Sequence, residues 1–173
     1  VRILNATSGE EVARIEDEGW LIPVFSPDDR ILAIAKHGLI LLWEVSTKRE
    51  LGRLRGHTLR ADSLIFSRDG KRLASASEDG TVRLWDVATR RPVATLRAGV
   101  DAFWSAAFSP DRRRLAGGTG DGRVVLWDLI TQQEVATFRV QQSGIVAVQF
   151  TPDGRTLVGV APQTVARWRA APR

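Results

Sequence analysis

The chain contains few of the side chains that enzymes and metal sites use most often. Among its 173 residues there are two histidines, His37 and His57, and no cysteine. A zinc site needs three or four nitrogen or sulfur ligands, so this composition argues against one. No serine lies in the strand–turn–helix context of a hydrolase nucleophile, and the carboxylates are scattered over turns without a recurring close pair. We therefore expect a chain that is not an enzyme, with no catalytic residues, no bound metal and no cofactor.

The glycine-rich segment 118–122 (GTGDG) superficially resembles a phosphate-binding loop. Such loops bind phosphate because a following helix directs amide N–H groups at the anion. No helical pattern follows Gly122, and the segment occupies the same repeat position as residues 77–81. We expect a hairpin turn here.

The chain is basic, with 25 lysines and arginines against 20 aspartates and glutamates. The clearest basic cluster is residues 112–114, at the tip of a predicted hairpin, and Arg53, Arg55 and Arg60 lie near another loop. A basic patch without interleaved aromatic side chains is usually a solvated face. The charge modestly favours acidic partners, and it does not favour nucleic acid over protein.

The elements that position these residues repeat along the chain. Two aromatic positions recur at intervals of about 42 residues. One is a phenylalanine, at Phe25, Phe66, Phe108 and Phe150, and the other is a tryptophan, at Trp43, Trp85, Trp127 and Trp168. The two best copies read IFSRDGKRLASASEDGTVRLWD from Ile65 and AFSPDRRRLAGGTGDGRVVLWD from Ala107. A period of about 40–45 residues ending in Trp-Asp is typical of propeller blades.

Each repeat predicts four short antiparallel strands. In the best copy these are residues 61–66, 72–77, 81–87 and 92–97. Asp69-Gly70 and Asp79-Gly80 between them are the residues that tight hairpin turns favour. Pro92 fits the start of an outer strand, where a missing N–H is least costly. The sequence therefore predicts an all-β fold.

The chain resembles the WD-repeat β-propeller family over essentially its whole length. The resemblance is carried by Gly56-His57, the F-S-x-D turns, LASAS and DGTVRLWD in fixed order. In that family a His, a Ser or Thr, an Asp and a Trp of each blade form a buried hydrogen-bonded set. The resemblance implies His57, Ser75, Asp79 and Trp85 for this set, with Ser77 as the alternative serine.

The other repeats depart from this pattern. Ala98-Gly99 replaces Gly-His in one repeat, where Gly117 also replaces the serine. His37 and Gln163 lie near the Asp position of two further repeats. These departures bear on local rigidity and not on the fold.

In this frame the chain is one propeller domain, 1–173, of about four blades. A part of a blade covers 1–17, full blades cover about 20–55, 61–97 and 103–139, and an incomplete last blade covers 144–169. Propellers of this family usually close with seven blades, sometimes six or eight, so we expect part of a ring. Either missing sequence completes it, or a second copy does, with residues 11–16 of each copy completing the other's last blade in an eight-bladed homodimer.

The resemblance implies a non-catalytic scaffold that binds proteins or peptides through the propeller rim and channel mouth. The expected contact residues are Arg60, Asp62, Glu78, Phe103 and Trp104. Phe103 and Trp104 cannot both face the same layer of a strand unless a bulge intervenes, so one of them should be core and the other exposed. Two alternatives are a nucleic-acid-binding propeller and a regulatory or sensor domain attached to a kinase or NTPase in missing sequence.

No apolar run is long enough to cross a bilayer, and no signal-peptide pattern opens the chain. We therefore expect a cytoplasmic chain without a membrane partner.

Overall fold

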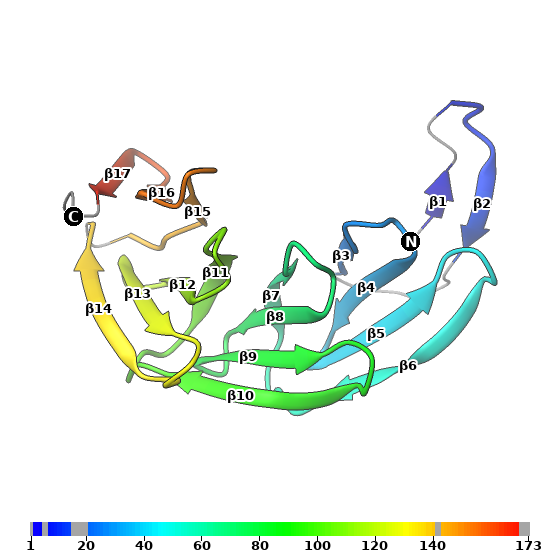
Figure 1. Cartoon of the computed structure of the whole chain (residues 1–173), viewed down its shortest axis with the longest axis horizontal. Helices are drawn as coiled ribbons and strands as arrows, with labels where there is room; N and C mark the ends of the chain where they lie inside the picture. Colours follow the sequence, from blue (N-terminus) through cyan, green and yellow to red (C-terminus); the bar gives the residue numbers. More distant parts are fainter. Residues whose placement is uncertain (1, 5–6, 15–20, 141–142, 170–173) are drawn as a thin grey trace.

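The computed structural model describes residues 2–4, 7–14, 21–140 and 143–169. These residues form seventeen β-strands and no helix, arranged in five antiparallel sheets that follow one another along the chain (Figure 1). The first two sheets contain β1 (Arg2–Leu4) and β2 (Glu11–Arg14), then β3 (Ile22–Phe25), β4 (Ile31–Lys36), β5 (Leu39–Glu44) and β6 (Arg49–Arg55). The next two contain β7 (Ala61–Phe66), β8 (Arg72–Ser77), β9 (Thr81–Asp86) and β10 (Arg91–Arg97), then β11 (Phe103–Phe108), β12 (Arg114–Thr119), β13 (Arg123–Asp128) and β14 (Glu134–Arg139). The last contains β15 (Ala147–Phe150), β16 (Thr156–Ala161) and β17 (Thr164–Arg169). The expectation of an all-β fold built from four-stranded antiparallel sheets is confirmed.

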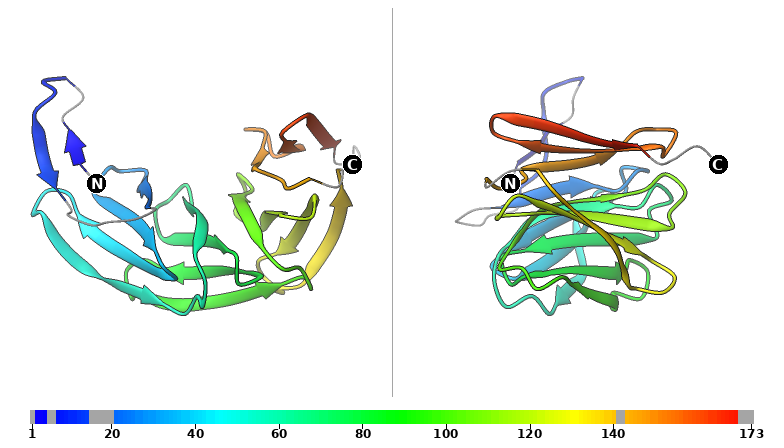
Figure 2. Two further views of the ribbon diagram at one scale, coloured as in Figure 1. Left: turned by 180° about the vertical axis from the view of Figure 1, so that it is seen from behind. Right: turned by 90° about the vertical axis from the view of Figure 1, so that its left-hand side faces the viewer.

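The five sheets form an open arc. In Figure 1 the strands β3, β7, β11 and β15 lie along the concave side, and β6, β10 and β14 run along the convex side. The side view in Figure 2 shows the sheets as successive layers. The arc does not close, so the described residues form part of a ring.

Three predicted strands differ slightly from the observed ones. The strand expected at 81–87 ends at Asp86, and the one expected at 92–97 begins one residue earlier, at Arg91. The strand expected at 11–16 is β2 as far as Arg14, and residues 15 and 16 lie outside the described part of the chain. The described residues contain no helix that could serve as a membrane span.

Short polar clamps fix the hairpin turns. In the β7–β8 turn Ser67 Oγ donates to Asp69 Oδ1 at 2.7 Å, and the backbone N–H of Lys71 donates to the same oxygen at 3.1 Å. Gly70 follows with a φ of 69°, a left-handed conformation that glycine adopts without strain. The hydrogen bond from Ser67 is the main reason why the pKa of Asp69 falls to about 2. The same clamp recurs in three other turns, at Ser26–Asp28, Ser109–Asp111 and Thr151–Asp153.

The cores lie between neighbouring sheets. Trp85 packs with Leu42 and Leu54 of the preceding sheet, and Trp127 packs with residues of the β7–β10 sheet in the same way. Both indoles are only 1% exposed. Burying a side chain of this size contributes about 3 kcal/mol, so each tryptophan holds two sheets together.

Candidate functional site

A buried hydrogen-bonded network ties the β7–β10 sheet together. The imidazole of His57 lies between two side chains, with Nε2 2.7 Å from Ser75 Oγ and Nδ1 2.8 Å from Asp79 Oδ2. Trp85 Nε1 donates to the same Ser75 oxygen at 2.8 Å. The backbone N–H of Thr58 donates to Asp79 at 3.1 Å. The structure thus brings together the four residues that the resemblance implied, from the β6–β7 loop, β8, the β8–β9 turn and β9.

The protonation states follow from the surroundings of the two titratable groups. Burial by itself would raise the pKa of Asp79, but hydrogen bonds from Thr81 and His57 and from a backbone N–H lower that pKa to about 2. Burial lowers the pKa of His57, and the hydrogen bond to Asp79 offsets this only in part. His57 is therefore neutral near pH 7. We assign its proton to Nδ1, because the carboxylate can only accept, and Nε2 then accepts from the Ser75 hydroxyl.

The alternative serine, Ser77, has a different role. Its hydroxyl donates to the backbone carbonyl of Arg60 at 2.7 Å and accepts from the N–H of Asp79 at 3.1 Å. These bonds hold the β8–β9 turn against the loop that carries His57. Ser77 therefore supports the network from outside and does not contact the imidazole.

The sequence of contacts Ser75–His57–Asp79 has the hydrogen-bond pattern of a hydrolase triad. It lacks the access that a nucleophile needs. Ser75 is 0% exposed, and the side chain of His57 is 0% exposed. The Ser75 oxygen also accepts a hydrogen bond from Trp85, which occupies one of its lone pairs. The network is therefore suited to stabilising the fold and not to attacking a substrate.

In the β3–β6 and β11–β14 sheets other side chains occupy the position of Ser75 beside the tryptophan. Ile34 occupies the position of Ser75 in the β3–β6 sheet, and the buried Trp43 Nε1 has no hydrogen-bond partner within the described residues. In the β11–β14 sheet Gly117 takes that position, and a Cβ there would lie 2.9 Å from the rings of both Phe103 and Trp127. Those two rings pack together with their centroids 5.4 Å apart. An apolar pair thus replaces the polar network in this sheet.

The expectation that Phe103 belongs to an exposed rim is wrong. Its side chain is 0% exposed, because its ring fills the space that Gly117 leaves beside Trp127. The other four expected contact residues, Arg60, Asp62, Glu78 and Trp104, are at least partly exposed.

A β-bulge at the start of β11 makes the side chains of Phe103 and Trp104 point in different directions. The register between β11 and β12 shifts between Phe103 and Ser105. Phe103 packs in the core toward the β7–β10 sheet, while Ser105 donates to the Ile145 carbonyl on the other side at 3.0 Å. Regular alternation would put residues 103 and 105 on the same side, so Trp104 is the inserted residue. It is 39% exposed, in contrast to its buried neighbours.

The indole of Trp104 rests on glycine backbone. A Cβ at Gly144 would overlap the ring, and one at Gly120 would lie 3.2 Å from it. These two glycines come from the β12–β13 turn and from the segment before β15. The ring is therefore supported from beneath while part of its surface stays open to solvent.

A second bulge lies at the same position of the preceding sheet. The register between β7 and β8 shifts between Ala61 and Ser63, which makes Asp62 the inserted residue. Arg60 Nε lies 2.7 Å from Asp62 Oδ1, and Arg60 Nη2 lies 2.9 Å from Glu78 Oε1. Burial raises the pKa of Asp62, with Arg60 opposing this shift and Glu78 adding to it. The arginine therefore joins two carboxylates, and these three side chains together carry one net negative charge.

Sequence reasoning missed several exposed apolar residues, and two of them lie in connections between strands. Leu59 is 53% exposed in the loop between His57 and Arg60, and Ile130 is 76% exposed in the β13–β14 turn. The sequence signal for both was a large aliphatic residue in a predicted connection between strands, where polar residues are usual.

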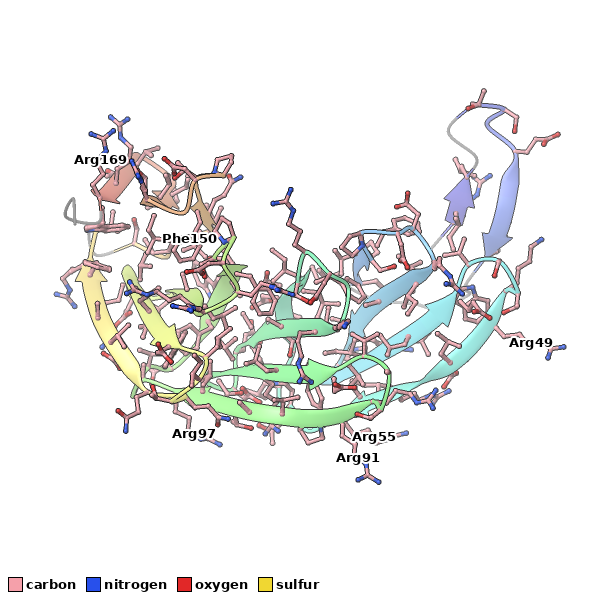
Figure 3. All side chains as sticks on the ribbon, in the orientation of Figure 1. Arg49, Arg55, Arg91, Arg97, Phe150 and Arg169 are labelled. Atoms are coloured by element: carbon pink, nitrogen blue, oxygen red, sulfur yellow. The ribbon has the colours of Figure 1, made fainter. Side chains whose placement is uncertain are left out.

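The described residues contain no group of three or more His, Cys, Asp or Glu side chains placed to hold a metal ion. The arginines are also dispersed. Figure 3 shows Arg49, Arg55, Arg91 and Arg97 projecting from the convex side of the arc. They extend the positive charge along the outer strands instead of concentrating it on the concave side.

An arc of four-stranded antiparallel sheets, with equivalent buried tryptophans between them and one His–Ser–Asp–Trp network, defines a β-propeller built from sequence repeats. The family model described as "WD domain, G-beta repeat" matches residues 48–86 and 90–128. The chain therefore contains WD repeats over these two segments, consistent with the WD-repeat family. Each matched segment contains the outermost strand of one sheet and three strands of the next, β6–β9 and β10–β13. Each sequence repeat therefore links two successive sheets covalently. No curated protein matches the chain.

Proposed function

We propose that the chain is a non-catalytic interaction module that binds a protein or peptide partner at its upper rim. The upper rim is the face of the arc that carries Arg60, Asp62, Glu78 and Trp104. WD repeats generally mediate protein–protein interactions, which favours this class of function. The observation that carries the proposal is Trp104, a tryptophan that a bulge directs out of the core and that glycine backbone supports.

The chemistry of the rim suits recognition of a partner. Tryptophan and arginine are the residues most enriched at the energetic centres of interfaces. Trp104 offers a large apolar surface whose orientation is already fixed, so little side-chain entropy is lost on binding. Exposed ion pairs such as Arg60–Glu78 contribute little to folding stability, and charged side chains at the rim of an interface favour partners of complementary charge.

A pulldown from the source lysate, quantified by mass spectrometry, tests the proposal. Trp104→Ala and Glu78→Arg should each deplete the same set of captured proteins. Val135→Ser, an apolar-to-polar change at an exposed position of the outer strand β14, is the matched control and should retain that set. Thermal melting must show that the variants are folded, because Trp104 also packs on two glycines. Unchanged capture by both rim variants would remove this face from consideration.

The nucleic-acid alternative makes a different prediction. Its support is the surplus of arginine, and affinity that depends on phosphate contacts falls steeply with salt. Both RNA binding and protein capture should therefore be measured at physiological salt. If single-stranded RNA no longer binds and the protein partners are still captured, the protein-binding function is favoured. Attachment to a kinase or NTPase and a cytoplasmic location stay predictions from the sequence.

A further inference from the structure

The face opposite the upper rim contains a groove that none of the functional residues above explains. This lower face carries the β7–β8, β9–β10, β11–β12 and β13–β14 turns. The groove has a volume of about 400 Å³ and lies between the β7–β10 and β11–β14 sheets. Its apolar lining includes Val93, which is 40% exposed, and Ile130, which is 76% exposed. Two aliphatic side chains thus stand open to solvent at one place.

The walls of the groove are held in place by hydrogen bonds. Asp128 Oδ1 accepts from the backbone N–H of Ile130 at 2.8 Å and of Thr131 at 2.9 Å, which fixes the β13–β14 turn. An ion pair between Arg112 and Asp69 joins the two sheets beside the groove. A preformed site of this kind loses little conformational entropy when a ligand binds.

The charges of the groove leave one cation available. Three arginines and two aspartates line it. Asp69 is already bound by Ser67 and by Arg112, and Asp111 accepts from Ser109 and from the N–H of Arg113. Arg72 pairs with Asp86, and Arg112 pairs with Asp69. The side chain of Arg113 is exposed and makes no hydrogen bond or ion pair in the part of the chain that the structure describes, although its charge helps to lower the pKa of Asp111. The groove therefore offers an exposed guanidinium next to aliphatic surface.

An equivalent groove one repeat earlier shows that this combination is not a general consequence of the fold. It has a volume of about 470 Å³ and lies between the β3–β6 and β7–β10 sheets. Its lining carries three aspartates against one lysine and one arginine, and Ala88 occupies the position of Ile130. The earlier groove is therefore acidic and lacks the exposed branched side chain. Lys71 takes the position of Arg113 in the earlier groove, so both grooves carry a cation there. Of these two grooves in the described residues, the later one suits an anionic, apolar ligand better.

We propose that the groove between the β7–β10 and β11–β14 sheets binds an extended segment of a partner protein that presents a branched aliphatic side chain beside a carboxylate. The aliphatic side chain packs between Val93 and Ile130, and the carboxylate pairs with the guanidinium of Arg113. The guanidinium is planar and matches a carboxylate with two parallel hydrogen bonds. The exposed apolar side chains of the groove, Val93 and Ile130, are aliphatic, and its one aromatic residue, Phe108, is half-buried. Single-stranded nucleic acid is held mainly by aromatic stacking, so the chemistry favours a peptide. The site is independent of the upper rim.

Selection of a random peptide library on the intact chain tests this proposal. The selected peptides should carry an aliphatic residue next to Asp or Glu, and fluorescence anisotropy then measures their affinities. Arg113→Glu and Ile130→Ser should each weaken binding about tenfold. Both side chains are exposed, so neither change should alter the melting temperature.

Two control variants make the test specific. Arg155→Glu makes the same charge change at the equivalent turn position of the last sheet, and Trp104→Ala alters the upper rim. Both should leave peptide affinity within about twofold of the unaltered chain. The proposal is overturned if the selected peptides lack carboxylates, if Arg113→Glu does not weaken them, or if Trp104→Ala abolishes them, since the rim would then be their site. A single-stranded RNA probe that binds more tightly than any selected peptide and depends on Arg113 would overturn it as well.

Discussion

Ser75→Ala should destabilise the chain by far more than the loss of one hydroxyl group suggests. The Ser75 oxygen accepts from Trp85 Nε1 at 2.8 Å, and its hydroxyl donates to His57 Nε2 at a separation of 2.7 Å. All three groups lie in the core, so the variant leaves an indole N–H and an imidazole nitrogen buried without partners. Each orphaned group costs about 1–3 kcal/mol, so the two together cost roughly 2–6 kcal/mol. That is a large fraction of the roughly 5–15 kcal/mol typical of a folded domain.

Ser105→Ala is the matched control. Ser105 is also buried, at 6% exposed, but within the described residues its hydroxyl makes one hydrogen bond, to the carbonyl of Ile145 at 3.0 Å. The same atoms are removed from a similar environment, so the expected cost is about 1 kcal/mol. Urea unfolding followed by far-ultraviolet circular dichroism measures both values without depending on tryptophan fluorescence.

A double-mutant cycle isolates the contact itself. In a Trp85→Phe background the indole donor is absent, so Ser75→Ala then orphans one group fewer and should cost about 1–2 kcal/mol less. Equal losses for Ser75→Ala and Ser105→Ala, or a cost that is unchanged in the Trp85→Phe background, would refute the assigned network.

Three further predictions concern stability and assembly. Trp85→Ala should cost about 3–5 kcal/mol in urea unfolding, whereas the exposed Arg113→Ala should cost under about 0.5 kcal/mol, and similar small losses would contradict the assigned core. Because burial lowers the pKa of His57 in the folded chain, the unfolded chain binds more protons below about pH 6.5, and the free energy of unfolding should fall as the pH drops from there. His57→Gln should flatten that slope, and an unchanged slope would show that another group causes it. A second loss should follow below about pH 3.8 as Asp79, with a folded pKa of about 2, takes up its proton. Two copies should associate into a ring of eight sheets, because the end sheets expose apolar side chains, and a well-folded monomer in sedimentation at micromolar concentration would count against this closure.

The sequence by itself determined the repeating architecture, because the signals involved are local. A turn such as Ser67–Asp69 is clamped by its own side chains, and Gly70 supplies the positive φ that the hairpin requires. Alternating small apolar residues then define strands such as Arg72–Ser77. The recurrence of Trp-Asp at a fixed interval predicts that these units stack as equivalent sheets. The partners of His57 followed from the family resemblance, since nothing local joins residues about twenty positions apart.

Only the tertiary structure decided which repeated positions are buried and which are exposed. Phe103 and Ala61 occupy equivalent positions in their sheets. Because Gly117 has no side chain, there is space beside Trp127 into which the Phe103 ring packs. The bulges at Asp62 and Trp104 each insert one residue, which changes the direction of every side chain before them relative to those after. The groove that exposes Val93 and Ile130 exists because turns from two different sheets meet there. Such features depend on contacts between repeats, and the pattern within one repeat contains no information about them.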